Sequence, residues 1–372
     1  MLSVLSTLSP VVRDLDALDR AVAELAAAVR LLHAVTPTNA REEHQRLGDV
    51  FLRGGSSMPR WTYANAPVPA VAATLPTVAQ AAARHGSTLG IVYFARITEI
   101  ARELAVQARA GTREIGAHAS ERYRMAHGDG LIADADETAR RWVAARPDPD
   151  DAPRRATDDP HPASLKSLLE REIGARKLAF GVRVVYGLAS LAATGAQNVY
   201  VARGRLVTDA VARRTAVHEI EGHVTPRARA RSAPLRLFFV GTAGGHDTQE
   251  GFALWHEERS ELLDGERRAE LGLRHLACRE MDRGADFVEV MRRLVRDLGA
   301  SQTTALAITE RIFRGSDGRS AGLGRERVYL PQFLRVRSHL GTRPEDAAIL
   351  GAGQLGLDVL DLARELLERD VA

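Results

Sequence analysis

The chain has 372 residues, enough for a large hydrophobic core and, we expect, two lobes. Its 51 Lys and Arg against 48 Asp and Glu give a net charge of +3, and the charges are mixed along the sequence, so a nucleic-acid partner is not indicated. The single cysteine, Cys278, excludes an intrachain disulfide and a cysteine-based zinc site. No stretch approaches the roughly 18 apolar residues of a membrane helix, and the first residues do not resemble a signal peptide. We therefore expect a cytoplasmic protein with no membrane partner.

Helical periodicity dominates the first 145 residues. Apolar side chains recur at helical spacing over residues 11–35 and 77–110, and the sequence HGST at residues 85–88 interrupts the second stretch. A further helix is predicted for residues 132–145. Together these segments predict a helical N-terminal lobe over residues 1–145.

A proline-rich segment follows this lobe. Five prolines stand among Asp and Arg in residues 146–162, and proline does not fit a helix interior or a central strand. We predict a linker or loop over residues 146–163 and a second lobe over residues 164–372.

The second lobe begins with a predicted helix at residues 164–176 and then changes its periodicity. Residues 180–187 and 198–204 are rich in β-formers and bounded by turn residues, so both are predicted strands. From residue 208 the chain is again predicted to be helical, with breaks at Pro226 and at residues 241–245, 315–324 and 341–344. The predicted fold class is α+β and mostly helical, with a small sheet.

The sequence HEIEGH at residues 218–223 places two histidines five positions apart on the helix predicted from residue 208. On an ideal α-helix this spacing separates His218 from His223 by about 140° around the axis, against about 40° for the i,i+4 pair of the commoner zinc-protease motif. A single π-turn would bring the two rings back to one side, and such turns concentrate at functional sites. Gly222, directly before His223, is where backbone distortion costs least.

A catalytic zinc site needs a third protein ligand and one open position. The best candidate is Glu250, 27 residues after His223 and at the start of the next predicted helix. An alternative stays open, because Asp247 and Glu250 have the spacing of a helix capping box. Other candidates for the ligand role are His246, His256 and Glu257.

Two short motifs resemble a known family of zinc metallopeptidases. HEIEGH followed by TQEGFA at residues 248–253 resembles the HExxxH and (T/Q)EGLA pair of a family that includes the eukaryotic microtubule-associated tyrosine carboxypeptidases. The same family includes the bacterial flavohemoglobin-expression-modulating QEGLA-motif proteins. Weaker similarity extends over most of the chain, in the segments at residues 58–63, 120–128 and 311–333.

This resemblance implies a zinc metallopeptidase fold, with His218, His223 and Glu250 as metal ligands and Glu219 as general base. It also implies removal of a C-terminal residue, which is aromatic for the eukaryotic members. The sequence departs from the family pattern in QEGFA for QEGLA, in Val224 after the second histidine, and in YLPQF at residues 329–333. The last two departures concern the identity of the substrate more than the metal.

A carboxypeptidase also needs a cation for the terminal carboxylate of its substrate, and the two-pronged guanidinium of arginine suits that role. Arg311 and Arg314 match the Arg-x-x-Arg-Gly pattern of the family and are the favoured candidates. The alternative is that the arginines of this segment cover a solvated loop. The candidates in the segment are Arg311, Arg314, Arg319, Arg325 and Arg327.

Two further features have a functional and a purely structural interpretation. Tyr329 is a candidate donor to the oxyanion of the tetrahedral intermediate, or a core tyrosine with a satisfied hydroxyl. The strand at residues 198–203 could be an edge strand that pairs with an extended substrate, or an ordinary strand of the sheet.

The sequence therefore predicts a zinc-dependent carboxypeptidase whose partner is a peptide or a peptide-like substrate. One alternative is a zinc hydrolase of a small amino-acid conjugate or biosynthetic peptide. The other is a metal-stabilised regulatory protein without activity, against which the intact Glu219 argues. The two histidines and one glutamate would also suit iron or manganese, and the sequence does not define the oligomeric state.

Overall fold

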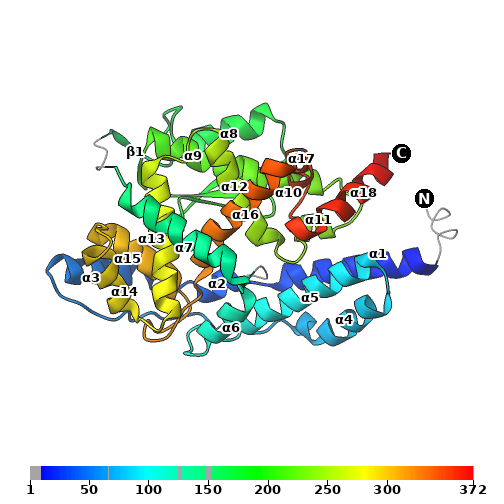
Figure 1. Cartoon of the computed structure of the whole chain (residues 1–372), viewed down its shortest axis with the longest axis horizontal. Coiled ribbons are helices and arrows are strands. Elements are labelled where there is room, and N and C mark those ends of the chain that lie inside the picture. Colours follow the sequence, from blue (N-terminus) through cyan, green and yellow to red (C-terminus); the bar gives the residue numbers. More distant parts are fainter. Residues whose placement is uncertain (1–9, 66, 125–127, 148–151, 372) are drawn as a thin grey trace.

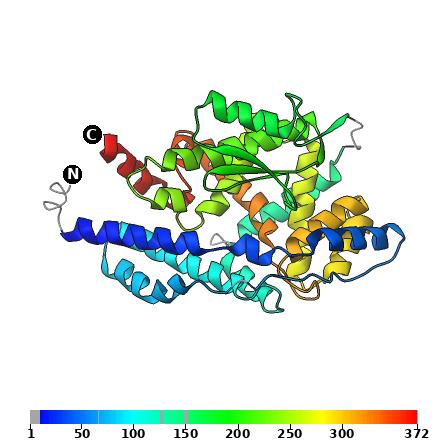
Figure 2. The same ribbon diagram turned by 180° about the vertical axis from the view of Figure 1, so that it is seen from behind.

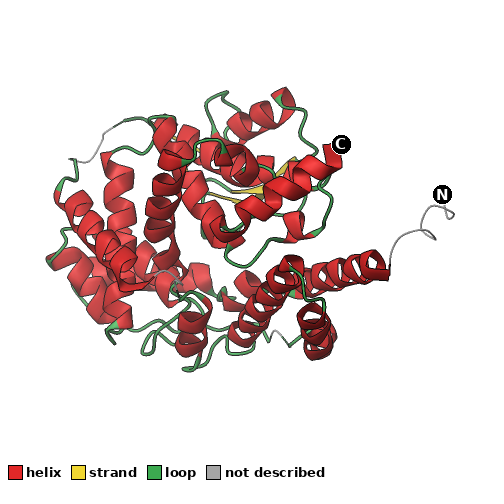
Figure 3. Ribbon diagram, turned by 45° about the vertical axis from the view of Figure 1, so that its right-hand side comes forward, coloured by secondary structure: helices red, strands yellow, loops and turns green. Residues whose placement is uncertain are grey.

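The structure is a computed structural model that describes residues 10–65, 67–124, 128–147 and 152–371. Helices make up most of it, and the strands, drawn in yellow in Figure 3, form two small sheets. This confirms the prediction of a mostly helical α+β fold. Residues 148–151 of the predicted linker and residues 125–127 of the family-like segment lie outside the described residues.

The N-terminal part is helical, as predicted. Ser87 begins α5 by accepting a hydrogen bond from the Gly90 N–H (3.2 Å), which explains the interruption at residues 85–88. The long helix α1 lies along α4 and α5 at one side of the molecule (Figures 1 and 2). The helices are α1 (Pro10–Ala28), α2 (Leu31–Val35), α3 (Ala40–Leu52), η2 (Ala70–Thr74), α4 (Leu75–Arg84), α5 (Thr88–Gln107), α6 (Ile115–Arg122) and α7 (Gly128–Ala144). Of these, α3 and α6 were not predicted.

Two short sheets follow. In one, β1 (Arg154–Ala156) pairs antiparallel with β5 (Leu206–Thr208), so a strand begins inside the predicted linker. In the other, β4 (Asn198–Ala202) lies between β2 (Gly181–Val185), which is parallel to it, and β3 (Ala192–Thr194), which is antiparallel. The strands predicted at residues 180–187 and 198–204 are β2 and β4.

The order of the second sheet decides between the two interpretations of residues 198–203, because they form an ordinary strand inside the sheet and not an edge strand. Because β2 and β3 occupy both sides of β4, its backbone has no free edge for a substrate. The edge strand that precedes it, β3, pairs on one side only within the described residues.

The rest of the chain is helical, and the breaks expected at residues 241–245 and 315–324 are confirmed. The break expected at residues 341–344 begins only at Arg343, because the preceding helix continues through Thr342. The prediction that the helix ends at Pro226 is wrong, because the chain stays helical through Ala230. Pro226 stands in the first turn of α10, where a missing N–H costs little. The helices are α8 (Leu165–Ala175), α9 (Asp209–Glu219), η3 (Ile220–Val224), α10 (Thr225–Ala230), α11 (Leu237–Val240), α12 (Gly245–Arg259), α13 (Gly265–Asp282), α14 (Phe287–Arg296), α15 (Gln302–Phe313), η4 (Arg325–Val328), α16 (Tyr329–Thr342), α17 (Asp346–Leu350), η5 (Leu357–Val359) and α18 (Leu360–Val371).

Close helix contacts hold α12 in the middle of the molecule. A Cβ on Gly251 would lie 2.5 Å from the Gln332 carbonyl group, so glycine lets α12 pack directly on α16. Helix α7 also packs on α13 and α16. One hydrophobic cluster, which contains Val35, Leu47, Leu276 and Phe333, joins residues from distant parts of the chain. The division of the chain near residues 146–163 stays a prediction. No helix among the described residues is both long and apolar enough to cross a membrane.

Candidate metal centre

The helix that carries the two histidines contains the predicted π-turn. Thr208 begins α9 by accepting a hydrogen bond from the Val211 N–H (3.2 Å), and the helix stays α-helical up to Glu219. Residues Ile220–Val224 then form a π-turn that leads into α10. The extra residue of the HExxxH spacing is absorbed there, so both histidine rings face the same side of the helix, with centroids 5.2 Å apart.

Glu250 of α12 completes a group of three residues that could hold a metal ion. One ligand atom from each of His218, His223 and Glu250 lies within 4.8 Å of the other two. The Oε2 atom of Glu250 is 3.5 Å from Nε2 of His218 and 3.8 Å from Nε2 of His223. Among the described residues, no second group of three His, Cys, Asp or Glu side chains converges in this way.

The capping-box interpretation of Glu250 is wrong. Helix α12 begins at Gly245, after Gly244 in a left-handed conformation, so Asp247 is already inside the first turn. Asp247 instead pairs with Arg122 (3.0 Å). Glu250 is thereby free to use one oxygen toward the histidines while the other accepts a hydrogen bond from Arg325 (2.8 Å).

Glu257 orients His218 through the ring nitrogen that does not face Glu250. Its Oε1 atom lies 2.7 Å from Nδ1 of His218, so the ring donates its Nδ1 proton to Glu257 and turns Nε2 toward the metal position. Glu257 is completely buried, and it stands seven residues after Glu250 on α12, which is two helical turns. This donor set and its supporting carboxylate fit a divalent metal of the zinc type.

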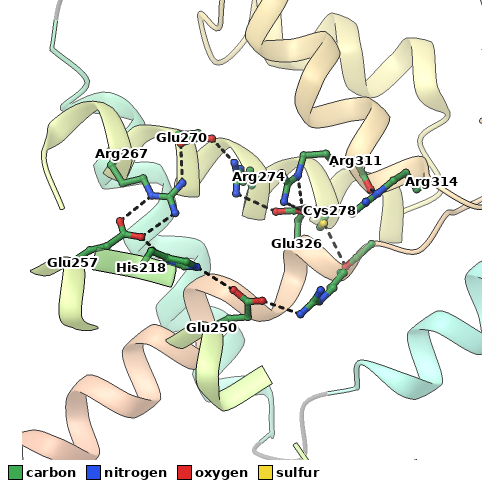
Figure 4. A network of polar contacts seen from close by, with 12 residues as sticks. His218, Glu250, Glu257, Arg267, Glu270, Arg274, Cys278, Arg311, Arg314 and Glu326 are labelled. Carbon is green, nitrogen blue, oxygen red and sulfur yellow. Dashed lines mark hydrogen bonds and ion pairs between the residues drawn. The ribbon is translucent and has the colours of Figure 1, made fainter. Parts of the chain in front are cut away.

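A row of alternating charges continues from Glu257 along α13 (Figure 4). Arg267 binds Glu257 (3.1 Å) and Glu270 (2.9 Å), and Arg274 pairs with Glu270. Because these three residues are three and four positions apart on α13, they lie on one face of that helix. Arg274 then reaches Glu326 (3.4 Å), which also pairs with Arg311 (2.8 Å). We call the six residues Glu257, Arg267, Glu270, Arg274, Glu326 and Arg311 the charge row.

The charges of the site shift the pKa values of its members. Burial alone would lower the pKa of His218, but its hydrogen bonds to Glu250 and Glu257 raise it to about 9. Burial alone would raise the pKa of Glu250, but Arg325 and the two histidines hold it far below its usual range. The pKa of His223 is lowered, chiefly by burial. The site thus stabilises a positive charge beside a carboxylate that stays ionised.

Glu219 lies next to the metal position, and a residue of the sheet holds it there. Its side chain is 6% exposed, and its Oε2 atom accepts a hydrogen bond from the hydroxyl of Thr194 (2.7 Å). Thr194 ends β3, so the edge strand of the sheet contacts the predicted general base directly. No sequence motif marked Thr194, because its role depends on the pairing of β3 with β4.

The predicted substrate-binding residues lie in different surroundings. Arg311 is the far end of the charge row, and Arg314 donates from Nε to the Arg311 carbonyl group (3.3 Å). Tyr329 begins α16 and is 9% exposed, and burial together with Glu250 raises the pKa of its hydroxyl. Arg325 is the arginine of this segment that pairs with a candidate metal ligand, Glu250.

Comparison with known proteins identifies the family of the chain. A family model described as "Microtubule-associated tyrosine carboxypeptidase" matches residues 50–372, which include all three candidate ligands, Glu219 and Thr194. No curated protein sequence matches the chain. Since the family match covers most of the sequence, it confirms the resemblance carried by HEIEGH and TQEGFA. The chain belongs to the microtubule-associated tyrosine carboxypeptidase family, and this membership implies a carboxypeptidase-like function.

Proposed function

We propose that this protein is a zinc-dependent carboxypeptidase that removes one C-terminal residue from a peptide in the cytoplasm. The observation that carries the proposal is the convergence of His218, His223 and Glu250 beside a buried Glu219. Two neutral imidazoles and one carboxylate are a ligand set of catalytic zinc sites in peptidases. The family match supports the peptide substrate and leaves the preferred C-terminal residue, tyrosine or another, to experiment.

In the proposed mechanism, His218, His223 and Glu250 would hold the zinc ion. When bound, zinc would act as a Lewis acid that polarises a carbonyl group and lowers the pKa of water. Glu219 accepts the proton of the attacking water and donates it to the nitrogen of the leaving residue. The Thr194 hydroxyl restricts the Glu219 carboxylate to one orientation.

Three further side chains have proposed roles at the substrate. Tyr329 would donate a hydrogen bond to the oxygen of the tetrahedral intermediate. This role is supported by the effect of the Glu250 charge, which raises the pKa of the Tyr329 hydroxyl. Arg311 and Arg314 stay predictions for the terminal carboxylate of the substrate. Arg311 is already paired with Glu326, whereas Arg314 has no carboxylate within 4.0 Å among the described residues.

The peptide would lie against β3. This strand has an edge that the described residues leave unpaired, and it ends at the residue that contacts Glu219. An extended substrate that pairs with β3 would place its last peptide bond near the general base.

The test is mass spectrometry of a peptide library with all twenty C-terminal residues, incubated with the zinc-loaded protein. Loss of one terminal residue, absent with Glu219→Gln at equal zinc content, would support the carboxypeptidase and report its preference. If Glu219→Gln is as active as the original protein, the mechanism is wrong. If all peptides stay intact although each chain holds one zinc, the protein is not a general carboxypeptidase, and small amino-acid conjugates become the substrates to test.

A further inference from the structure

One arginine near the candidate metal centre has no hydrogen-bond or ion-pair partner among the described residues. Arg227 lies on α10, which directly follows the π-turn, and it stands four residues after His223. Its Nε atom is buried and has no hydrogen-bond partner, and no carboxylate of the described residues lies within 4.0 Å of its guanidinium group. A buried donor without a partner is costly, so such a group points to a missing ligand.

The charges around Arg227 are those of the active site. Glu219 and Glu250 attract it and Arg325 repels it, while Arg227 in turn disfavours protonation of His223 and His246. Burial is the largest effect and lowers the pKa of Arg227 to about 10, so the guanidinium stays charged at neutral pH. The residue as a whole remains partly exposed, which leaves a small anion a way to reach it.

The other arginines of the region are engaged. Arg325 binds the metal ligand Glu250 (2.8 Å) and Arg311 binds Glu326 (2.8 Å). Arg314 contacts a backbone carbonyl group, and the charges acting most strongly on it are those of Arg311, Glu326, Arg325 and Tyr329 rather than Glu219. Arg227 differs from these three arginines because it makes no hydrogen bond or ion pair among the described residues, and Glu219 is the charge that acts on it most strongly.

The place of Arg227 in the chain suits a carboxylate one residue beyond the scissile bond. Four residues of helix advance about 6 Å along the axis, so Arg227 begins roughly one turn away from His223. In an extended peptide, the terminal carboxylate lies about 3.5 Å beyond the scissile carbonyl group. The flexible side chain of an arginine at this position can bring its guanidinium group within hydrogen-bond distance of such a carboxylate.

We infer that Arg227 binds the C-terminal carboxylate of the substrate and thereby makes the last peptide bond the one that is cut. The inference rests on the proposed function. It assigns to Arg227 the role that the sequence suggested for Arg311 and Arg314, and it leaves the roles of the metal ligands and Glu219 unchanged.

The experiment compares a cleavable peptide with its C-terminal amide, using zinc-loaded protein. The original protein should cleave the free acid at least about tenfold faster than the amide, since charge-assisted hydrogen bonds are lost with the amide. Arg227→Gln should bring the ratio of the two kcat/KM values close to one, and Arg227→Lys should keep part of it. Arg229→Gln, which changes an exposed arginine on the same helix, should leave the ratio unchanged. Because both rates come from one preparation, partial misfolding cancels.

A binding measurement separates this inference from the proposed function. In the Glu219→Gln background, fluorescence anisotropy should show that the free-acid peptide binds more tightly than the amide, and that adding Arg227→Gln abolishes the difference. If the original protein discriminates acid from amide and Arg227→Gln still does, the inference is overturned while the carboxypeptidase stands. A collapse of the ratio in Arg314→Gln instead overturns it in favour of Arg314. If neither peptide binds nor is cleaved, both proposals fall.

Discussion

Gly222 packs directly on Ala253, where the π-turn of the histidine helix crosses α12. A Cβ on Gly222 would lie 2.2 Å from the Cβ of Ala253 and 2.8 Å from its Cα. Since real Cβ atoms do not approach so closely, any side chain at position 222 would push the two helices apart. Gly222 directly precedes His223, and Ala253 stands three positions after Glu250 on the same helix. The contact therefore sets the distance between two candidate ligands.

Gly222→Ala should weaken both the fold and the metal site. Overpacking of this kind costs about 1–3 kcal/mol, and the separation of His223 from Glu250 should lower the affinity for zinc. Thermal unfolding and zinc titration would measure the two effects. The control is Gly174→Ala in α8, where nothing lies within 4 Å of the added Cβ, and which should stabilise by about 0.5–1 kcal/mol. Gly222→Ala with Ala253→Gly should recover part of the loss, and unchanged zinc affinity in the single variant would contradict the argument.

Glu257→Gln should lower the affinity for zinc, although residue 257 is not itself a candidate ligand. The amide can no longer hold His218 as a charged acceptor, and loss of such a supporting partner typically lowers metal affinity by about 10–100-fold. Competition with a chromophoric chelator would measure the affinity. Glu258→Gln, at the adjacent position, removes only a contact with Arg337 (3.4 Å) and should bind zinc normally. Equal zinc affinity in both variants would show that Glu257 only neutralises Arg267.

Thr194→Val should slow catalysis at full zinc occupancy. Without the hydroxyl, the Glu219 carboxylate loses its hydrogen bond from β3 and becomes free to rotate away from the water. A hydrogen bond to a charged group contributes about 1.5–3 kcal/mol, so kcat should fall by at least about tenfold, with little change in KM. Thr194→Ser keeps the hydroxyl and should restore most of the rate. If Thr194→Ser is as slow as Thr194→Val, the methyl group and not the hydrogen bond is what matters.

Acid should destabilise the protein through Glu103. Burial alone would raise the pKa of this carboxyl, but Arg96 and Arg122 lower it from 4.5 to about 2. Because the folded pKa lies below the unfolded one, the carboxylate contributes stability above about pH 4.5, and this contribution is lost as the pH falls toward 2. Urea unfolding at a series of pH values would show the decline.

The matched variant is Glu103→Gln. It leaves the buried guanidinium of Arg122, which binds Glu103 at 2.9 Å, with one carboxylate fewer, so it should cost about 3–5 kcal/mol at neutral pH. Its stability should also change less between pH 4.5 and 2 than that of the original protein. An unchanged decline would assign the acid sensitivity to other carboxylates.

The sequence predicted those parts of the site that lie along one stretch of chain. The five-residue spacing of His218 and His223 required a π-turn, and Gly222 marked where it could form. Glu219, the proposed general base, belongs to the same motif. Glu250 needed the TQEGFA motif in addition, because a capping box explained its position equally well.

The parts that sequence reasoning missed depend on contacts between distant elements. Thr194 reaches Glu219 only because β3 pairs with β4, and a three-residue strand has no detectable periodicity. Arg325 reaches Glu250 across 75 positions, whereas the local pattern favoured Arg311 and Arg314. The prediction that the helix ends at Pro226 was wrong because the rule for proline assumes a regular series of i→i−4 hydrogen bonds. The π-turn at Ile220–Val224 interrupts this series just before Pro226.

The charge row restricts how this sequence can change over time. An inner member such as Glu270 lies between the buried Arg267 and the partly buried Arg274. A single neutral replacement of Glu270 therefore leaves two cations under-compensated at once. A joint exchange that keeps the signs alternating, or that removes an oppositely charged pair together, avoids this loss. Relatives should therefore differ at these positions in correlated steps. The correlation should extend through Glu326 to Arg311, which pair with each other and not with a candidate metal ligand.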